Sequence, residues 1–505
     1  MHNLPDLFDH ISDRFAGGVP ALSDGAHTLD GAALRQRVAQ ISAALLARRA
    51  PRAPVAILAD NSPEWLAVDL ATQRLGLTLV PLPLFFIAAQ WMHVLVDSGA
   101  TALFCASAGQ GAALGFGSAI GCGGPLLLCE AADTPAAGLP DSLAGIQKIT
   151  FTSGTTSTPK GVCLGTDQQW QVARALRDGV AGLALERHLC LLPFAVLLEN
   201  IAGPYTALLS GATTICPPLA ETGLGGASRF DPLVCLAAIE RHRPHSIIVL
   251  PQMLQALVAV TVDGDPRLAS LRFVAVGGAR TPPRLLAAAR ARGLPVFEGY
   301  GLSECASVVA LNLPGAAREG SVGKPLAHRP VRIAADGEIE VGGEIEVGGE
   351  AAHYLGQSPG RPGDWLATGD LGHLDADGFL HIDGRKKDIL ITGFGRNVSP
   401  EWPETALLGT GAIAQAVVVG DGQPYLAALI VPLAAHIGAE QIAAAVARAN
   451  RDLPDYAQVR RWALAAPFTP ANGQATANGR PRRPVIHQHY APQIAALYDT
   501  TETTA

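Results

Sequence analysis

The sequence predicts an α/β protein. It has a large N-terminal domain with helix-covered parallel sheets and a small β-rich subdomain, followed by a small α+β C-terminal domain. Strand-like apolar runs alternate with helical patterns through the first three quarters of the chain, which is typical of parallel sheets covered by helices. From about Val331 the pattern changes to short strands with Gly and Asp turns, and a smaller block follows Gly384. A chain of 505 residues is also too long for one hydrophobic core.

The first strand–helix–strand unit lies near the N-terminus. Residues 53–60 (APVAILAD) are predicted to form a buried strand. Ser62 can then cap a helix that starts at Pro63 and runs to Gly76, because Ser is a favoured N-cap and Pro is favoured in the first turn. Residues 77–82 (LTLVPL) are predicted to be the next strand.

The same unit recurs in the middle of the chain. Residues 245–251 (HSIIVLP) and 271–279 (LRFVAVGGA) are predicted strands. Thr281 is expected to cap a helix that has two prolines in its first turn and ends near Gly293. A further strand is expected at residues 294–299 (LPVFEG).

The β-rich part follows. Residues 372–384 (GHLDADGFLHIDG) predict a hairpin with Asp377 and Gly378 at the turn. The hexapeptide IEVGGE occurs twice in tandem at residues 339–350. Two copies cannot make a repeat architecture, so we expect a local hairpin extension without a chemical role.

We place the domain boundary at Gly384 to Asp388. This gives an N-terminal domain of residues 1–384 and a C-terminal domain of residues 385–505. In the second domain the pattern predicts strands at residues 414–420 and 425–432, and a helix at about residues 439–450.

Composition excludes several classes of protein. Hydrophobic residues make up 49% of the chain and charged ones 16%, so the chain can bury a large core and is not disordered. A net charge of -7 argues against a general nucleic-acid binder. The eight cysteines contain no CxxC pair, which favours reduced, buried thiols in a cytoplasmic protein over a disulfide framework or a zinc site.

Residues 98–129 contain no charged side chain, which raises the question of a membrane span. The segment also contains eight glycines with several serines and is only weakly apolar. We therefore expect buried strands and small-residue loops, and no transmembrane segment.

The strongest chemical signal is the stretch TSGTTSTPKGV at residues 152–162, which holds six hydroxyl side chains. It follows the apolar run IQKITF, as though carried on a strand end. Gly154 permits close approach of the backbone, the hydroxyls add donors, and Lys160 supplies a positive charge. Together they suit a polyphosphate. The stretch is not a Walker loop, because Pro159 precedes the lysine where that motif requires glycine.

This stretch resembles the phosphate loop of the adenylate-forming superfamily, which includes acyl-CoA synthetases, luciferases and the adenylation domains of peptide synthetases. Three further motifs of that family follow in the same order: EGYGLSE at 298–304, TGD at 368–370 and DGRKKDILITGFGRNVSPEWPE at 383–404. LPFAVLLEN at 192–200 is a weaker match. The resemblance runs from residue 56 to residue 483 and is closest to long-chain fatty acyl-CoA synthetases.

The resemblance implies activation of a carboxylic acid by ATP to an acyl-adenylate, with release of pyrophosphate, and transfer of the acyl group to the thiol of CoA. Mg2+ would accompany ATP. Fatty acid metabolism is the implied setting, and a medium- or long-chain fatty acid or similar apolar carboxylate is the implied substrate. The implied C-terminal domain is mobile and swings between adenylation and thiol-transfer poses.

The resemblance also assigns roles to individual residues. Tyr300 would lie against adenine, Ser303 would donate to a phosphate or to the acyl carboxylate, and Glu304 would hold Mg2+. Asp370 would accept from the ribose hydroxyls. The residues implied to hold the β- and γ-phosphates are Thr152, Ser153, Gly154, Thr155, Thr156 and Lys160. The other implied contacts are Gly277 and Gly278 (close approach of substrate), Arg385 (nucleotide), Lys387 (hinge), and Gly393 and Gly395 (pantetheine tunnel).

The chain departs from the family pattern at Arg480, which stands where relatives carry a lysine that reaches the reacting carboxylate and phosphate. The chain has five lysines against 32 arginines, so arginine has replaced lysine almost everywhere. Arg480 keeps the charge, but its planar fork differs from a compact ammonium, so adenylation could be slower. Val196 stands where many relatives have histidine, and Ser157 where glycine is common. Cys305 has no His at a readable spacing and is interpreted as a packing residue.

Three interpretations remain open. The leading one is an acyl-CoA synthetase. A second keeps adenylation but transfers the acyl group to an acyl carrier protein, or performs another carboxylate chemistry such as β-lactone formation. The third is a nucleotide- or acyl-binding protein without turnover, because of Arg480. The acyl chain length, the oligomeric state and any peripheral membrane contact cannot be read from the sequence.

Overall fold

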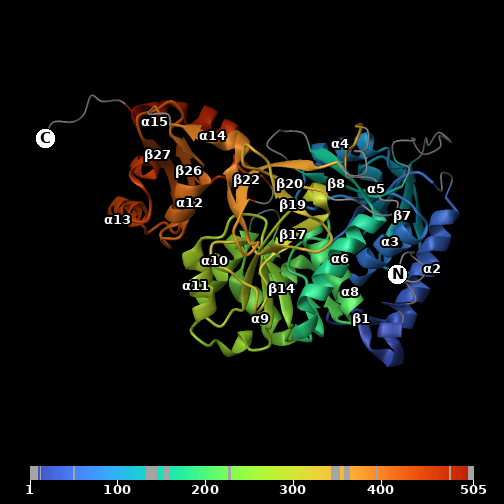
Figure 1. Ribbon diagram of the computed structural model, residues 1–505. Coiled ribbons are helices and arrows are strands. Elements are labelled where there is room, and N and C mark those ends of the chain that lie inside the picture. Colours follow the sequence, from blue (N-terminus) through green and yellow to red (C-terminus); the bar gives the residue numbers. More distant parts are fainter. Residues whose placement is uncertain are drawn as a thin grey trace, which may run out of the picture.

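A computed structural model describes residues 10–498 apart from 12, 49–51, 132–142, 144, 153–158, 226–228, 343–352, 358–363, 394–395 and 477–478. A large N-terminal domain contains two sheets with helices against them, and a smaller C-terminal domain sits at one side (Figure 1). The predicted fold class is confirmed.

The first sheet carries the strands that flank the phosphate loop. Its order is β21-β9-β8-β4-β3-β5-β7-β6, with parallel pairing among β5, β3, β4 and β8 and antiparallel pairing toward both edges. Its strands are β3 (Val55–Leu58), β4 (Leu79–Pro81), β5 (Ala102–Cys105), β6 (Phe116–Gly121), β7 (Leu127–Ala131), β8 (Ile146–Thr152), β9 (Lys160–Gly165) and β21 (His353–Tyr354). The neighbouring helices are α2 (Gly31–Leu46), α3 (Pro63–Arg74), α4 (Ala88–Ser98), α5 (Ala108–Ala113) and α6 (Thr166–Val180).

The second sheet has the order β18-β17-β16-β15-β14-β10-β11-β1-β2 and is parallel from β16 to β1. Its strands are β1 (Pro20–Ser23), β2 (Thr28–Asp30), β10 (Arg187–Leu189), β11 (Thr213–Ile215), β14 (Ser246–Val249), β15 (Phe273–Val276), β16 (Val296–Leu302), β17 (Ser307–Leu311) and β18 (Lys324–Pro325). Its helices are α7 (Leu197–Asn200), α8 (Thr206–Ser210), α9 (Pro232–His242), α10 (Pro251–Val260) and α11 (Pro283–Ala291). A pair, β12 (Leu224–Gly225) and β13 (Arg229–Phe230), lies outside the sheet.

Two helix N-caps were predicted, and one of them is correct. The Ser62 hydroxyl accepts a hydrogen bond from Trp65 N, so Ser62 caps α3 as expected. Thr281 does not cap α11, because Pro282 occupies the N-cap position and makes no side-chain cap bond. The Thr281 N–H instead donates to Glu298 Oε1 at 3.0 Å, which holds Thr281 one residue outside the helix.

The uncharged segment of residues 98–129 forms the end of α4, then β5, α5, β6 and part of β7. Strands β5 and β7 are largely buried. The expectation of buried strands and small-residue loops is therefore confirmed. No helix in the described ranges is both long and apolar enough to cross a bilayer.

The β-rich subdomain is an antiparallel sheet in the order β19-β20-β22-β23. Its strands are β19 (Val331–Ile333), β20 (Glu338–Val341), β22 (Leu366–Leu374) and β23 (Leu380–Arg385). The predicted turn between β22 and β23 is present, with Gly378 at φ 80°, a conformation that favours glycine. The first copy of the tandem hexapeptide supplies most of β20, whereas residues 343–350 lie outside the described residues.

The C-terminal domain packs helices against a three-stranded sheet of β26 (Ile413–Val419), β27 (Leu426–Pro432) and β28 (Val459–Leu464). Its helices are α12 (Glu401–Leu408), α13 (Ala439–Asn450), α14 (Arg483–His489) and α15 (Ala491–Ala496), and β24 (Leu390–Ile391) pairs with β25 (Asn397–Val398). The two predicted strands and the helix are present, whereas β28, which pairs with β27 in parallel, was missed. The domain boundary stays a prediction.

Candidate active site

A cavity of about 1070 Å3 lies where the second sheet, the β-rich subdomain and the C-terminal domain meet. Residues from all three parts line it. Ten of the residues chosen from the sequence are among them: Lys160, Gly277, Gly278, Tyr300, Ser303, Glu304, Asp370, Arg385, Lys387 and Arg480. The structure therefore brings together residues that are up to 320 positions apart in the sequence, counted from Lys160 to Arg480.

Tyr300, Asp370 and Arg385 form a connected polar group in this cavity. The Tyr300 hydroxyl donates to Asp370 Oδ2 at 2.7 Å, and Arg385 Nε lies 2.9 Å from Asp370 Oδ1. Asp370 and Arg385 face each other as register partners on β22 and β23, so the hairpin itself sets their distance. Burial raises the pKa of Asp370, although Arg385 and Tyr300 act in the opposite direction. The arrangement presents an aromatic ring beside a carboxylate and a guanidinium, which suits a nucleoside.

A second group contains Lys160, Tyr354 and Glu304. The Tyr354 hydroxyl donates to Glu304 Oε1 at 2.5 Å, and Lys160 Nζ lies 5.9 Å from the centroid of the Tyr354 ring. Burial, and then the Glu304 carboxylate, raise the pKa of Tyr354. Tyr354 belongs to β21, which pairs with β9 just after Lys160. Sequence reasoning missed Tyr354, because it stands in no motif and reaches the site through tertiary pairing.

The phosphate-loop stretch lies between the ends of two strands. Strand β8 ends at Thr152 and β9 begins at Lys160, and these two residues are partners in the antiparallel ladder. The backbone therefore carries the loop on a strand end, as predicted. Ser153, Gly154, Thr155 and Thr156 lie outside the described residues, and so does Gly395.

Strand β8 is held by a buried polar network that sequence reasoning also missed. Lys148 Nζ lies 3.0 Å from Asp69 Oδ2 and 2.9 Å from the hydroxyl of Tyr205, which itself donates to the same carboxylate oxygen at 2.7 Å. Lys148 is 1% exposed and Asp69 is fully buried. Burial lowers the pKa of Lys148, whereas the Asp69 carboxylate acts to raise it. This ion pair lies four residues before Thr152 and ties the loop-bearing strand to α3.

Gly277 and Gly278 directly follow β15. Gly278 has φ +84°, and a Cβ there would meet Leu250 Cδ2 at 2.9 Å. Its carbonyl oxygen accepts hydrogen bonds from Arg480 Nε at 3.0 Å and from Arg480 Nη2. The guanidinium of the C-terminal domain therefore reaches across the cavity to the backbone of the N-terminal domain.

The two lysines after Arg385 have different surroundings. Lys386 is exposed and forms ion pairs with Asp336 at 2.6 Å and Glu338 at 2.7 Å. Lys387 lines the cavity. Gly393 is not part of the cavity lining: its N–H donates to the carbonyl oxygen of Gln423 at 2.8 Å within the C-terminal domain.

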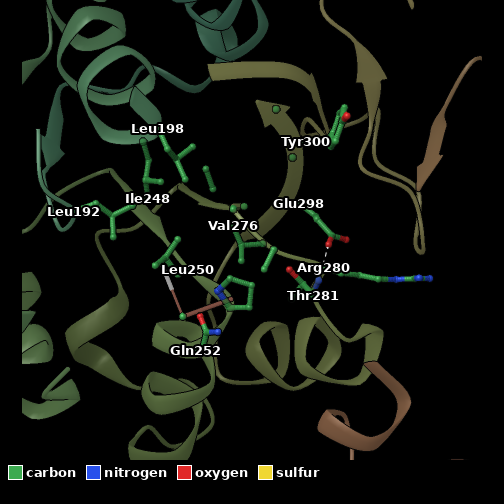
Figure 2. A pocket seen from close by; sticks show the side chains of 18 of the residues that line it. Leu192, Leu198, Ile248, Leu250, Gln252, Val276, Arg280, Thr281, Glu298 and Tyr300 are labelled. Carbon is green, nitrogen blue, oxygen red and sulfur yellow. Dashed lines mark hydrogen bonds between the residues drawn. The ribbon is translucent and has the colours of Figure 1, made fainter. Parts of the chain in front are cut away.

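The far side of the cavity is apolar (Figure 2). Figure 2 shows Leu192, Leu198 and Ile248 on the side away from Tyr300 and Glu298, with Val276 between the two groups. The carboxyl ends of parallel strands β14 and β15 position Ile248 and Val276, whereas Leu198 comes from α7. One continuous cavity therefore joins a polar wall to an apolar wall.

A buried His–Glu pair adjoins the cavity, which His188 helps to line. His188 Nε2 lies 2.9 Å from Glu199 Oε1, and Glu199 Oε2 accepts from the N–H groups of Leu191 and Leu192. His188, Cys190 and Glu199 are the group in the described part of the chain that comes close enough to share a metal ion. The hydrogen bonds to His188, Leu191 and Leu192 already explain how the Glu199 carboxylate is held. The quoted sequence LPFAVLLEN contained Glu199, but nothing in it indicated the pairing with His188.

Two buried titratable groups complete the site. Burial raises the pKa of Glu298, which lines the cavity, to about 7. Burial also raises the pKa of the Cys305 thiol to about 12, and Cys305 is fully buried. A thiol that stays protonated in a packed environment supports the interpretation of Cys305 as a packing residue.

Comparison with protein families decides the identity of this fold. Residues 8–353 match the model of the AMP-binding enzyme family, and residues 387–502 match the model of the AMP-binding enzyme C-terminal domain. The chain belongs to the AMP-binding enzyme family. The recognition of the adenylate-forming superfamily from sequence motifs is therefore confirmed, as is the prediction of an enzyme.

The relatives of this AMP-binding enzyme are named for different carboxylic acids. It is 29% identical to long-chain-fatty-acid–CoA ligase FadD15 of Mycobacterium bovis over 88% of each chain. It is 31% identical to feruloyl-CoA synthase of an Amycolatopsis species, over 81% of this chain and 84% of that one.

Solved structures show the same fold. The anthranilate CoA ligase AuaEII in complex with anthranoyl-AMP matches with a TM-score of 0.77 at 21% identity, over 98% of this chain and 100% of that chain. O-succinylbenzoate Coenzyme A synthetase of Bacillus subtilis, in complex with ATP and magnesium ion, matches with a TM-score of 0.73 at 24% identity, over 94% and 98% of the two chains.

Proposed function

We propose that this AMP-binding enzyme is an acid–CoA ligase whose acid is a medium- or long-chain fatty acid or a similar apolar carboxylate. One observation carries the proposal. The cavity joins a polar wall with Tyr300, Asp370 and Arg385 to an apolar wall with Leu198 and Ile248. A nucleotide fits the first wall and an apolar acyl group fits the second.

The proposed chemistry has two steps. A carboxylate oxygen attacks the α-phosphorus of ATP, and pyrophosphate leaves, which gives the acyl-adenylate. The sulfur of CoA then attacks the acyl carbonyl, loses its proton, and AMP leaves. Holding both reactants in one cavity supplies much of the rate enhancement through proximity and orientation. FadD15, feruloyl-CoA synthase and the anthranilate ligase carry names of the same reaction class, which supports the proposal.

Each residue of the cavity is assigned a role in this reaction. Lys160 and Arg480 both line the cavity and would supply positive charge where negative charge develops in the transition state. Asp370 would accept from the ribose hydroxyls, and Ser303 would donate to phosphate or carboxylate oxygens. Glu304 would hold Mg2+, because a carboxylate that opens onto a phosphate site offers the hard oxygen this ion prefers. The ion would neutralise phosphate charge.

One experiment tests both CoA as the acyl acceptor and the identity of the acid substrate. Purified enzyme is incubated with ATP, Mg2+ and CoA, using a chain-length series of fatty acids and ferulate as the aromatic comparison, and the products are identified by mass. We expect fatty acyl-CoA, AMP and pyrophosphate. Preference for ferulate would contradict the fatty-acid proposal. Pyrophosphate release without consumption of CoA would contradict CoA as acceptor, and ATP binding without any release would contradict an active ligase.

A further inference from the structure

The cavity follows one face of the second sheet. Register partners on parallel strands share a face, and every second residue of a strand returns to that face. On β14 and β15 the partners Ser246 and Phe273, and two residues later the partners Ile248 and Ala275, all line the cavity. Ser246 is the first residue of β14. The cavity therefore extends along the strands from their carboxyl ends, near Tyr300, to the amino-terminal end of β14.

Ser246 is far from the polar wall of the cavity, measured along the strands. Its partner Phe273 precedes Gly277 by four residues on β15. Because a parallel strand rises about 3.3 Å per residue, the two levels are about 13 Å apart. Gly278, the next residue, is the one that Arg480 contacts. An acid whose carboxylate lies near these glycines therefore needs a long, extended chain to reach Ser246.

Polar side chains line the cavity at this distant end. His188 on β10 is the register partner of Ser246, and its Nδ1 atom lies 3.0 Å from Ser246 Oγ. His188 is 4% exposed and Ser246 is 7% exposed. Two other hydroxyls of the cavity lining, those of Thr206 and Ser210, donate to backbone carbonyl oxygens of their own helical segment. His188 and Ser246 instead hydrogen-bond to each other across two strands.

Glu199 holds His188 in one orientation. Glu199 Oε2 accepts from two backbone N–H groups, and Oε1 lies 2.9 Å from His188 Nε2. The carboxylate is an acceptor, so we assign the imidazole hydrogen to Nε2, and Nδ1 of the neutral ring then accepts from the Ser246 hydroxyl. Glycine at position 203, within the π-helical turn Ile201–Tyr205, leaves room for this pair. A Cβ at Gly203 would lie 2.6 Å from both Glu199 Oε1 and His188 Nε2.

This arrangement leaves the Ser246 oxygen able to accept a further hydrogen bond. Among the described residues, the hydrogen bond to His188 is the one that the Ser246 side chain makes. A hydroxyl oxygen has two acceptor lone pairs, and its hydrogen is already directed at Nδ1. A group that donates a hydrogen bond therefore suits this position. A carboxylate does not, because its negative charge would lie near the Glu199 carboxylate.

We propose that Ser246 determines specificity by accepting a hydrogen bond from a hydroxyl group at the end of the acid's chain that is remote from the carboxylate. This inference rests on the proposed function and narrows the acid to a hydroxylated fatty acid. The chain lies along Ile248 and Ala275, and the hydroxyl donates to Ser246 Oγ. An oxo group in the same place has no hydrogen to donate and gains nothing from this oxygen.

Binding of a matched series of acids tests the proposal. Calorimetric titration of the intact enzyme compares straight-chain acids from octanoic to tetradecanoic acid with their ω-hydroxy and ω-oxo counterparts. At the chain length that reaches Ser246, we expect the hydroxy acid to bind about tenfold more tightly than the unmodified acid, which corresponds to one additional hydrogen bond. Shorter chains should show no such preference. The oxo acid should show none at any length.

Variants of Ser246 separate the hydroxyl from the shape of the side chain. Ser246→Ala should abolish the preference for the hydroxy acid. Ser246→Thr and Ser246→Val add the same methyl group and differ in the hydroxyl, so the first should keep a preference and the second should lose it. The control is Ser42→Ala, because the Ser42 hydroxyl is also buried and donates to the carbonyl oxygen of Val38 outside the cavity lining. This control should keep the preference.

Three results would overturn the proposal: equal binding of hydroxy and unmodified acids at every chain length, a preference that survives in Ser246→Ala, or tighter binding of the oxo acid than of the hydroxy acid. Formation of acyl-CoA from the same acids separates this inference from the proposed function. A preference in binding that Ser246→Ala abolishes, without any acyl-CoA product, would support the role of Ser246 and contradict the ligase. Acyl-CoA formation from fatty acids without the preference would do the reverse.

Discussion

At the scale of single residues, the structure connects charge and hydrogen bonds to individual roles. Tyr300, Asp370 and Arg385 were chosen from three separate motifs, and the structure places both Tyr300 and Arg385 within hydrogen-bonding distance of Asp370. Sequence could indicate them because each stands at a fixed place in a motif. It could not indicate Tyr354 or His188, whose contacts depend on strand pairing and on packing across the domain.

Arg480 carries the clearest prediction about rate. Its Nε and Nη2 atoms both donate to the carbonyl oxygen of Gly278. The planar guanidinium is therefore already hydrogen-bonded to the backbone. A lysine ammonium would be free to turn toward the developing charge, so we expect Arg480→Lys to raise acid-dependent pyrophosphate release severalfold. Arg480→Ala should lower it by about a hundredfold, the usual cost of removing a donor from such a site. An unchanged rate in Arg480→Lys would contradict the first expectation.

Tyr354 is predicted to position Glu304. Removing its hydroxyl in Tyr354→Phe leaves Oε1 of the carboxylate without this donor. A hydrogen bond to a charged group is worth about 1.5 kcal/mol or more, so we expect about a tenfold loss in kcat/KM for ATP. The Mg2+ concentration required for half-maximal rate should rise in the same variant, which a merely structural role would not produce. Tyr456→Phe, at an exposed tyrosine of the C-terminal domain, is the control.

Glu298 predicts a dependence of stability on pH. Its folded pKa of about 7 lies above the ordinary value of 4.5, because burial disfavours the charged form. Between these two values the folded state holds a proton that the unfolded state has released, so the contribution of Glu298 to stability falls as pH rises from about 4.5 to 7. Above pH 7 the free energy of unfolding of Glu298→Gln should therefore exceed that of the wild type by up to about 3 kcal/mol. Urea unfolding at pH 5 and pH 8 measures it. If the difference in free energy of unfolding between the variant and the wild type did not change with pH, the raised pKa of Glu298 would be contradicted.

At the scale of elements, apolar runs and capping residues predicted several of the core strands. Strands β3, β14 and β15 and helix α3 lie within their expected ranges, because burial between helices makes such strands continuous apolar runs. Strand β16 begins within its expected range but runs on to Leu302, three residues beyond it. The helix start at Thr281 was wrong, since Glu298, seventeen residues later, holds the Thr281 N–H instead. Strand β28 was missed because its sequence, VRRWAL, lacks a clear alternating pattern.

The element that carries the phosphate-loop stretch depends on Lys148. Lys148→Met leaves the buried Asp69 carboxylate without its cation, and breaking such a pair costs about 3–5 kcal/mol. We expect a corresponding loss in the free energy of unfolding, measured by urea titration. The double variant Lys148→Met/Asp69→Leu removes both charges and should recover part of that loss. A single variant as stable as the wild type would show that the network does not hold β8.

At the scale of the whole molecule, the site exists because three parts of the chain meet. The N-terminal sheets supply the apolar wall and Lys160, the β-rich hairpin supplies Asp370 and Arg385, and the C-terminal domain supplies Arg480. Motif order predicted that these residues serve one reaction. The contact of Arg480 with Gly278 depends on the packing of distant segments, which no local pattern encodes.

The central claim is that one cavity holds a nucleotide and an apolar acyl group at once. The most direct measurement is calorimetric titration of a stable analogue in which a sulfamoyl group joins adenosine to dodecanoic acid, compared with AMP alone and dodecanoate alone. The account predicts that the joined molecule binds at least about a hundredfold more tightly than either part, as analogues of reaction intermediates do. Binding no tighter than that of AMP would contradict it.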